Sequence, residues 1–275
     1  MPQIYVFINK LRIEIAIHFC KFAFLNKLHT LRYFIEFAYN GKNYFGFQVQ
    51  PDVISVQETL DKALSLLLRQ KIEIVGAGRT DSGVHAKQMF AHFDAIEIED
   101  IPKLIQRLNS FLPIDIVVFN IHIVHEDAHA RFDATSRKYE YYIHTFKDVF
   151  SNEGSWYVHH KLDVDKMNEA AKILLEYTDF ECFSKVHTDV KTFNCALSEA
   201  FWKQNENQII FTISADRFLR NMVRAIVGTL INVGLNKLSI NDFRKIIESK
   251  NRSKAGFSVP AHGLYLVEVK YPYIK

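Results

Sequence analysis

Alternating apolar and polar positions predict a β-strand near the beginning of the folded part of the chain. Within residues 32–39 every second side chain is aromatic or aliphatic, as expected when one face of a strand is buried. These apolar positions are Tyr33, Ile35, Phe37 and Tyr39. The polar run that follows, Asn40 to Asn43, contains a glycine and predicts a turn.

The rest of the pattern predicts helices and strands in mixed order. Ser55 and Glu58 form a capping box, which begins a helix that runs to Arg69. The other elements predicted before residue 131 are strands at 72–75, 89–93 and 114–124 and a helix at 101–112. Those predicted after it are strands at 138–146, 196–202, 209–214 and 264–271 and helices at 163–177, 217–233 and 239–249.

This order of elements predicts an α+β fold made of two similar mixed α/β halves. We expect antiparallel-rich sheets with helices on one face. The N-terminal half is predicted to span residues 31–135 and the C-terminal half residues 136–275. Because no Pro/Gly-rich linker separates them, the halves are expected to pack tightly, and a cleft between them is the natural place for a site.

Composition and charge limit the class of protein without deciding its function. With 275 residues, 48% of them hydrophobic, the chain is long enough to bury a substantial core. Lysine and arginine number 34 against 31 acidic residues, and the net charge of +3 neither requires nor excludes a nucleic-acid partner. The odd number of cysteines (Cys20, Cys182 and Cys195) without CxxC spacing argues against disulfides or a thiolate zinc site and favours the cytosol.

Residues 1–30 form an atypical N-terminal extension. Its apolar stretch, residues 4–24, is interrupted by charged and titratable side chains and is too polar for a membrane span. It also lacks the compact cationic start, clean apolar stretch and small-residue cleavage site of a signal peptide. One hypothesis is that translation begins later, near Leu31.

The glycine-rich segment 76–83, Gly-Ala-Gly-Arg-Thr-Asp-Ser-Gly, is the strongest candidate for chemistry. Its glycines let the backbone approach a ligand closely, and they display Arg79 and Asp81. A dinucleotide-binding loop would need glycine where Asp81 stands, and a P-loop would need Gly-Lys-Ser/Thr, so neither pattern fits. Taken alone, the segment is also compatible with a tight turn in which Asp81 caps backbone N–H groups.

A second candidate for binding is the predicted helix 217–233, which contains three arginines. In this helix, Arg217, Arg220 and Arg224 follow spacings of three and four and are expected to share one face. Such a face suits phosphates or a buried carboxylate, although a solvated basic face is the plainer interpretation.

Several segments together resemble the tRNA pseudouridine synthase A family. Residues 76–86 resemble that family's signature, Gly-Arg-Thr-Asp-x-Gly-Val-His-Ala. The other segments similar to family motifs are 33–39 with 43–48, 127–132 with 137–141, 218–228 and 260–267. Phe47 departs from the pattern, since tryptophan is usual there, but it keeps an aromatic surface. The likeness covers residues 31–273.

The resemblance implies a pseudouridine synthase fold and roles for individual residues. Asp81 is then the catalytic aspartate, Arg224 its charge partner, and Tyr139 the residue that contacts the target base. Without the resemblance, Tyr139 would be an ordinary strand aromatic. A carboxylate in a desolvated cleft tends to hold its proton. The positive charge of an adjacent Arg224 would oppose this tendency and favour the anionic form of Asp81.

The expected reaction is an isomerisation of uridine to pseudouridine in tRNA. The resemblance implies the anticodon stem-loop (nucleotides 38, 39 and 40), no cofactor, no metal, a homodimer and a cytoplasmic location. A uridine in a stem must be flipped out to react, and Arg79 would fill the space it leaves. Arg217 and Arg220 would bind substrate phosphates.

Three rival interpretations remain. His125-Glu126-Asp127-Ala128-His129 fits the HExxH pattern of zinc metallopeptidases, although the residues before it are predicted as a strand and no third ligand is evident. A non-catalytic RNA-binding protein could use the same arginines and aromatics. A glycosidase would use Asp81 but needs a second carboxylate, and none is identifiable at the loop.

Overall fold

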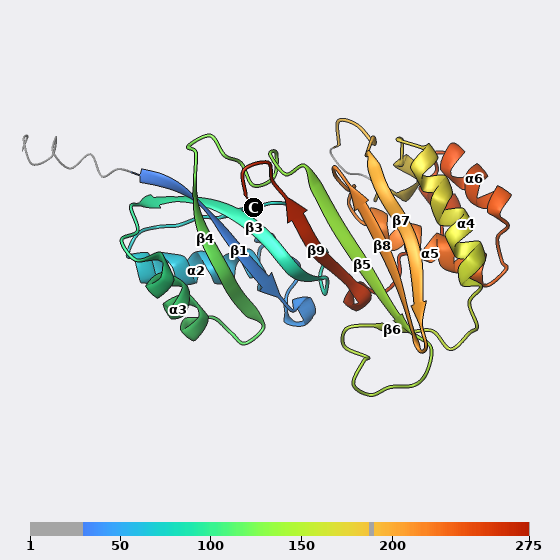
Figure 1. Ribbon diagram of the computed structural model, residues 1–275, viewed down its shortest axis with the longest axis horizontal. Coiled ribbons are helices and arrows are strands. Elements are labelled where there is room, and N and C mark those ends of the chain that lie inside the picture. The colour runs from blue at the N-terminus through green and yellow to red at the C-terminus, as the bar shows by residue number, and fades with distance from the viewer. Residues whose placement is uncertain (1–29, 187–189, 275) are drawn as a thin grey trace, which may run out of the picture.

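One continuous sheet runs through the protein, whose computed structural model describes residues 30–186 and 190–274 (Figure 1). Within those residues the strand order is β4-β1-β3-β9-β5-β8-β7, with short β2 on β3 and β6 on β5. The strands are β1 (Thr30–Tyr39), β2 (Val75–Gly76), β3 (His85–Ile96), β4 (Ile116–Val124), β5 (Ser136–His144), β6 (Trp156–Tyr157), β7 (Leu197–Asn205), β8 (Gln208–Ala215) and β9 (Leu264–Lys270). The predicted extension, apart from Thr30, lies outside the described residues.

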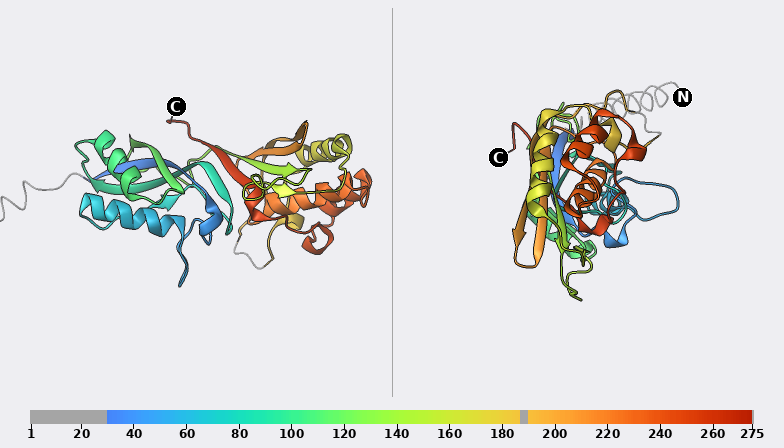
Figure 2. Two further views of the ribbon diagram at one scale, coloured as in Figure 1. Left: turned by 90° about the horizontal axis from the view of Figure 1, so that it is seen from below. Right: turned by 90° about the vertical axis from the view of Figure 1, so that its right-hand side faces the viewer.

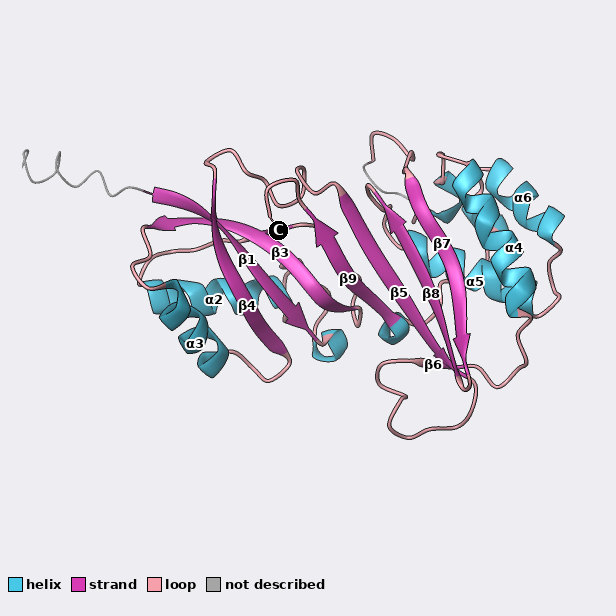
Figure 3. Ribbon diagram, in the orientation of Figure 1, coloured by secondary structure: helices cyan, strands magenta, loops and turns pink. Residues whose placement is uncertain are grey.

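The helices that the structure describes lie behind the sheet and at its two ends (Figure 3). They are α2 (Val56–Leu68), α3 (Ile101–Phe111), α4 (Val164–Ile173), α5 (Met222–Gly234) and α6 (Ile240–Glu248). In the view from below, α2 and α5 lie on the same side of the sheet (Figure 2). The predicted α+β class, with a mostly antiparallel sheet, is confirmed.

The C-terminal strand β9 joins the two ends of the sheet. It pairs in parallel with β3, where His85 is opposite Tyr265, and antiparallel with β5, where Tyr139 is opposite Leu266. In Figure 1 it lies between these two strands, and the chain end follows it. The last strand of the sequence therefore connects a strand from the first half of the chain, β3, with a strand from its middle, β5.

Two hydrophobic cores fill the structure, one at each end of the sheet. The first includes β1, β3, α2 and α3, and the second includes β5, β7, β8, α4, α5 and α6. Tyr139 on β5 packs against both cores. The β5 strand therefore carries this residue to the place where the two cores meet.

The structure corrects the predicted start of one helix. The sequence pattern predicts a helix at 217–233, but α5 begins at Met222 because Asn221 adopts a left-handed conformation with φ +66°. The Asn221 side chain donates a 2.6 Å hydrogen bond to Ser258 Oγ, which fixes this turn. Arg217 and Arg220 therefore precede the helix, and the expected helical face shared with Arg224 is wrong.

Other boundaries differ by smaller amounts. β3 begins at His85, inside the signature segment 76–86, four residues before the predicted start at Met89. The strand predicted at 72–75 is reduced to Val75–Gly76, and β6 was not predicted. The helix predicted at 163–177 ends at Ile173, where a 3₁₀ turn continues it.

Helix α5 lies unusually close to the segment that precedes β9. A Cβ atom added to Gly228 would lie 1.9 Å from the carbonyl oxygen of Phe257. The Gly256 N–H donates to Thr229 Oγ1 at 2.8 Å, and the Val259 N–H donates to the Arg224 carbonyl at 3.3 Å. This close approach holds the segment around Val259 beside Arg224.

We expect Gly228→Ala to destabilise the protein. The methyl group has no room unless α5 and residues 256–259 separate, which should cost about 2 kcal/mol and lower the melting temperature by several degrees. Thermal unfolding followed by circular dichroism measures the effect. Gly78→Ala is the matched control, since nothing lies within 4 Å of a Cβ at Gly78. Equal melting temperatures for the two variants would contradict the close packing.

A half-buried carboxylate lies on helix α2, which packs on the first core. Asp61 on α2 accepts a 2.7 Å hydrogen bond from the Ile74 N–H. Burial, the largest cause, raises the pKa of Asp61 to about 6, and the charges of Glu73 and Glu58 act in the same direction. The folded state therefore binds this proton more tightly than the unfolded state, and its stability falls as pH rises from about 4 to about 6.

Asp61→Asn is expected to remove this pH dependence. The amide oxygen can still accept from Ile74, but no charge forms, so the variant should be about 1 kcal/mol more stable than wild type at pH 7 after allowing for partial exposure. The melting temperature should rise by about 2–4 °C at pH 7 and change little at pH 4. A variant less stable than wild type at pH 7 would show that the ionised carboxylate stabilises the fold.

Candidate active site

Asp81 lies in the turn that connects β2 to β3. The turn is anchored at its start, where the Ala77 N–H donates to the Phe90 carbonyl at 2.8 Å. It closes where the Val84 N–H donates to the Asp81 carbonyl at 3.2 Å. The Asp81 side chain is 25% exposed, so it can reach a ligand while much of its water is already excluded.

A second loop supports the Asp81 turn from below. The Gly83 N–H and the Ser82 hydroxyl both donate to the Tyr44 carbonyl, each at 3.3 Å. Gly46 has φ +91°, and a Cβ there would lie 2.5 Å from the Thr80 carbonyl oxygen. Glycine is therefore required at this contact for two reasons, backbone conformation and space.

Phe47, which stands where the family that the sequence resembles usually has tryptophan, is part of this support. Phe47 is buried in the first core and stacks on Phe37 with ring centroids 6.1 Å apart. It fills the space beside Gly76. The substitution therefore keeps an aromatic ring under the loop.

Arg224 on α5 forms a salt bridge with Asp81. Its Nη1 donates to Asp81 Oδ2 at 2.9 Å, and its Nε donates to the Val259 carbonyl at 2.8 Å. The Arg224 side chain is 20% exposed, so both charges of the pair are largely shielded from water. The two residues are 143 positions apart in the chain, and the sheet brings them together.

Tyr139 lies close enough to Asp81 to be affected by its charge. Burial raises the pKa of Tyr139 to about 12; Arg137 opposes this shift and Asp81 adds to it. Its ring contacts Phe218 edge to face, with centroids 5.2 Å apart. The phenol is therefore neutral near pH 7 and can donate a hydrogen bond.

The three other predicted site arginines do not join this cluster. Arg79 and Arg220 are exposed and Arg217 is half-buried. Their guanidinium groups make no hydrogen bond or ion pair with the residues that the structure describes. They are cations available to an anion from outside the chain.

Sequence reasoning gave no role to Tyr39 and His85, which hold the loop in place. Tyr39 OH and Thr80 Oγ1 are 2.9 Å apart. His85 Nδ1 accepts from the Gly41 N–H at 3.0 Å, and His85 Nε2 lies 3.1 Å from the His262 carbonyl oxygen. Burial lowers the pKa of His85, which favours the neutral ring that these two contacts require. Only the position of His85 within the motif gave a signal.

The HExxH residues do not form the helix that a zinc peptidase needs. The structure places His125 to His129 in a turn, closed by a hydrogen bond from the Ala128 N–H to the His125 carbonyl. Within residues 30–186 and 190–274, no three His, Cys, Asp or Glu side chains are grouped to hold a metal. No described helix has the length and hydropathy to cross a bilayer.

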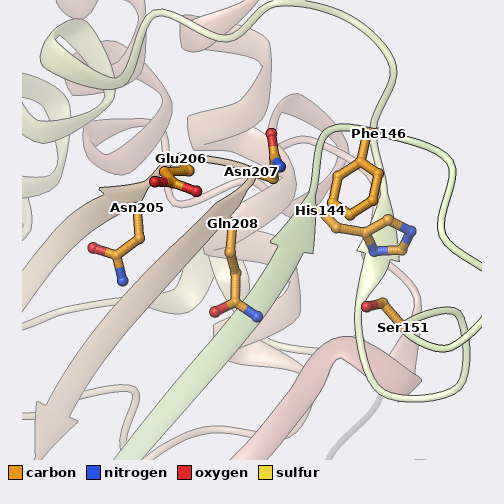
Figure 4. Close-up of a pocket in the computed structure, with 7 residues that line it drawn as sticks. All are labelled: His144, Phe146, Ser151, Asn205, Glu206, Asn207 and Gln208. Carbon is orange, nitrogen blue, oxygen red and sulfur yellow. The ribbon is translucent and has the colours of Figure 1, made fainter.

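A separate pocket lies at the C-terminal end of β5 (Figure 4). Its volume is about 500 Å³. It is lined by His144, Phe146, Ser151 and the hairpin Asn205–Gln208. None of the predicted site residues lines it, so the candidate active site rests on Asp81, Arg224 and Tyr139.

Comparisons with known proteins agree in assigning a family. The family model described as tRNA pseudouridine synthase matches residues 36–133 and 170–272. A protein named tRNA pseudouridine synthase A from Bacteroides fragilis is 56% identical over 243 residues, which are 88% of this chain and 96% of the relative. The protein of that name from Parabacteroides distasonis is 55% identical, with the same coverage of both chains.

More distant relatives bear the same name. The tRNA pseudouridine synthase A of Bacillus subtilis is 39% identical over 241 residues, which are 85% of this chain and 96% of the relative. The residues matched by the family model include the Asp81 turn and the α5 segment that carries Arg224. These matches show that this chain belongs to the tRNA pseudouridine synthase A family.

Proposed function

We propose that this chain isomerises uridine to pseudouridine in the anticodon stem-loop of tRNA, with Asp81 as the catalytic residue. The observation that carries the proposal is the salt bridge that holds Asp81 against Arg224 in a partly exposed turn. Membership of the tRNA pseudouridine synthase A family supports the reaction and the substrate. A protein that only binds RNA would have no need for a carboxylate at such a place.

The reaction moves one glycosidic bond and needs no net oxidant or reductant. The bond from ribose C1′ to uracil N1 breaks, the base turns, and a bond from C1′ to C5 forms. C5 then loses its proton and N1 gains one, so the product is an isomer of the substrate. Asp81 either attacks C1′ or removes a proton from the ribose, and both routes use the carboxylate as an anion. Arg224 supplies the opposing charge.

Tyr139 and the free arginines have supporting roles in this proposal. The ring of Tyr139 stacks on the flipped uracil, and its neutral phenol helps to move the proton at C5. Arg79, beside Asp81, fills the space that the uridine leaves in the stem. Arg217 and Arg220 bind phosphates, for which their unpaired guanidinium groups are suited.

The remaining parts of the proposal concern assembly and location. We propose that two copies of the chain form a homodimer and that the protein acts in the cytoplasm, where tRNA is modified. The buried thiols of Cys182 and Cys195 fit a reducing compartment, since burial raises the pKa of each to about 12 and keeps it unreactive. The division of the chain into halves at residues 135 and 136 also stays a prediction.

Asp81→Asn is expected to abolish the reaction. The amide keeps the size of the side chain but is neither a nucleophile nor a base, so turnover should fall roughly 10³-fold or more while folding and tRNA binding persist. Release of tritium from tRNA labelled at uracil C5 measures the rate. Asp94→Asn, the same change at an ion-paired aspartate on β3, is the control and should retain full activity. Turnover by Asp81→Asn would refute the proposal.

Arg79→Ala is expected to weaken productive binding of tRNA. Losing one cation beside the turn should raise KM roughly tenfold, with a smaller change in kcat, and should reduce the dependence of KM on salt. Steady-state kinetics at two salt concentrations measure both effects. Arg107→Ala removes an exposed arginine from α3, at the distant end of the sheet, and should leave KM unchanged. If the two variants raise KM equally, Arg79 has no special place in binding.

A further inference from the structure

Arg137 is a half-buried cation whose two terminal nitrogens are held by backbone carbonyl groups. Its Nη1 donates to the carbonyls of Ala134, at 2.8 Å, and Asp216, at 2.6 Å. Its Nη2 donates to the carbonyls of Ala77, at 3.1 Å, and Arg131. All four Nη protons are used, and no carboxylate accepts a hydrogen bond from them. Burial lowers the pKa of Arg137, because partial removal from water disfavours the charged guanidinium.

Two of the four carbonyl groups that Arg137 binds, those of Ala77 and Asp216, belong to the segments that carry Asp81 and Arg224. Ala77 begins the turn that presents Asp81, and its N–H is already fixed to the Phe90 carbonyl on β3. Asp216 follows β8 and begins the segment that leads to Arg224. One guanidinium therefore joins the approach to Asp81 with the approach to Arg224.

Asp216 is itself held by several hydrogen bonds. Its carbonyl group is therefore a fixed partner for Arg137. Its Oδ1 accepts from the Ala196 N–H and the Arg217 N–H, both at 2.7 Å. Its own N–H donates to the Ala196 carbonyl at 3.1 Å. The side chain and the backbone of Asp216 thus fix the beginning of the α5 segment to β7.

Arg137 also acts on Tyr139, two residues further along β5. The charge of Arg137 opposes the rise in the pKa of Tyr139 that burial causes. Phe218, two residues after Asp216, contacts the Tyr139 ring. The three side chains that the proposed reaction uses therefore all depend on segments that meet at Arg137.

We propose that Arg137 is a positioning residue that sets the alignment of Asp81 with Arg224 and Tyr139. This inference rests on the proposed function. A guanidinium is required because its planar fork directs four protons toward four separate carbonyls, whereas the ammonium of lysine presents three protons from one point. Lysine at this position keeps the charge and loses the geometry.

The test is the steady-state kinetics of Arg137→Lys. We expect kcat to fall roughly 10- to 100-fold because Asp81 and Arg224 lose their alignment, while KM for tRNA changes less than about threefold. Arg32→Lys is the matched control, since Arg32 also binds a carbonyl, that of Ala128, and lies at the distant end of β1. It should retain wild-type kcat. A kcat of Arg137→Lys within twofold of wild type would overturn the inference.

A double-mutant cycle separates positioning from a general loss of stability. If Arg137 acts through the Asp81–Arg224 contact, Arg137→Lys should add little to the loss caused by Arg224→Lys, because the contact is already broken. Independent, multiplying losses in kcat would refute the inference.

Arg137→Gln provides a second variant should the lysine variant fail to fold. It keeps two N–H donors without the charge, and it should show the same fall in kcat with little change in KM. Wild-type kcat in Arg137→Gln would also overturn the inference. Failure of the proposed function is read separately, from the wild-type protein: if it makes no pseudouridine in tRNA, the reaction itself is wrong.

Discussion

The salt bridge between Asp81 and Arg224 requires two parts of the chain 143 residues apart to meet within hydrogen-bonding distance. A carboxylate on a flexible turn and an arginine on a separate helix would not stay together in water, where an exposed pair contributes little energy. The pair is therefore a consequence of the fold rather than its cause. Its geometry depends on how rigidly the turn and the helix are each held, and on what joins them.

Strand β9 makes that joining possible. It pairs in parallel with β3, which begins just after the Asp81 turn, and antiparallel with β5, which carries Tyr139. The residues before β9 pack against α5, and the Val259 carbonyl there accepts the second hydrogen bond of Arg224. The last strand of the chain is therefore needed to complete a candidate site whose central residue, Asp81, lies in the first third of the sequence. Without β9, Asp81 and Arg224 would belong to separate cores.

The sequence predicted what local patterns determine. Periodicity located the main strands and helices, and the resemblance of residues 76–86 to the family signature predicted a catalytic role for Asp81, which stays a prediction. The sequence pattern could not predict the start of α5, because the left-handed turn at Asn221 is fixed by a contact with Ser258, 37 residues away. The helical spacing of Arg217 and Arg220 was misleading for the same reason. Nor could it predict one continuous sheet, since the pairing of β9 with β3 depends on tertiary contacts and leaves no local pattern.

The residues that the sequence left without a role share one physical feature. Arg137, His85 and Tyr39 each bind groups outside their own segment, and most of those groups belong to the backbone. Backbone carbonyl and N–H groups are much the same whatever the residue type. The sequence therefore does not reveal which residue a side chain contacts through its backbone. Yet these contacts, more than the salt bridge, hold the turn rigid. The proposed reaction requires the Asp81 carboxylate to be held precisely, and the backbone contacts around the turn contribute to that precision.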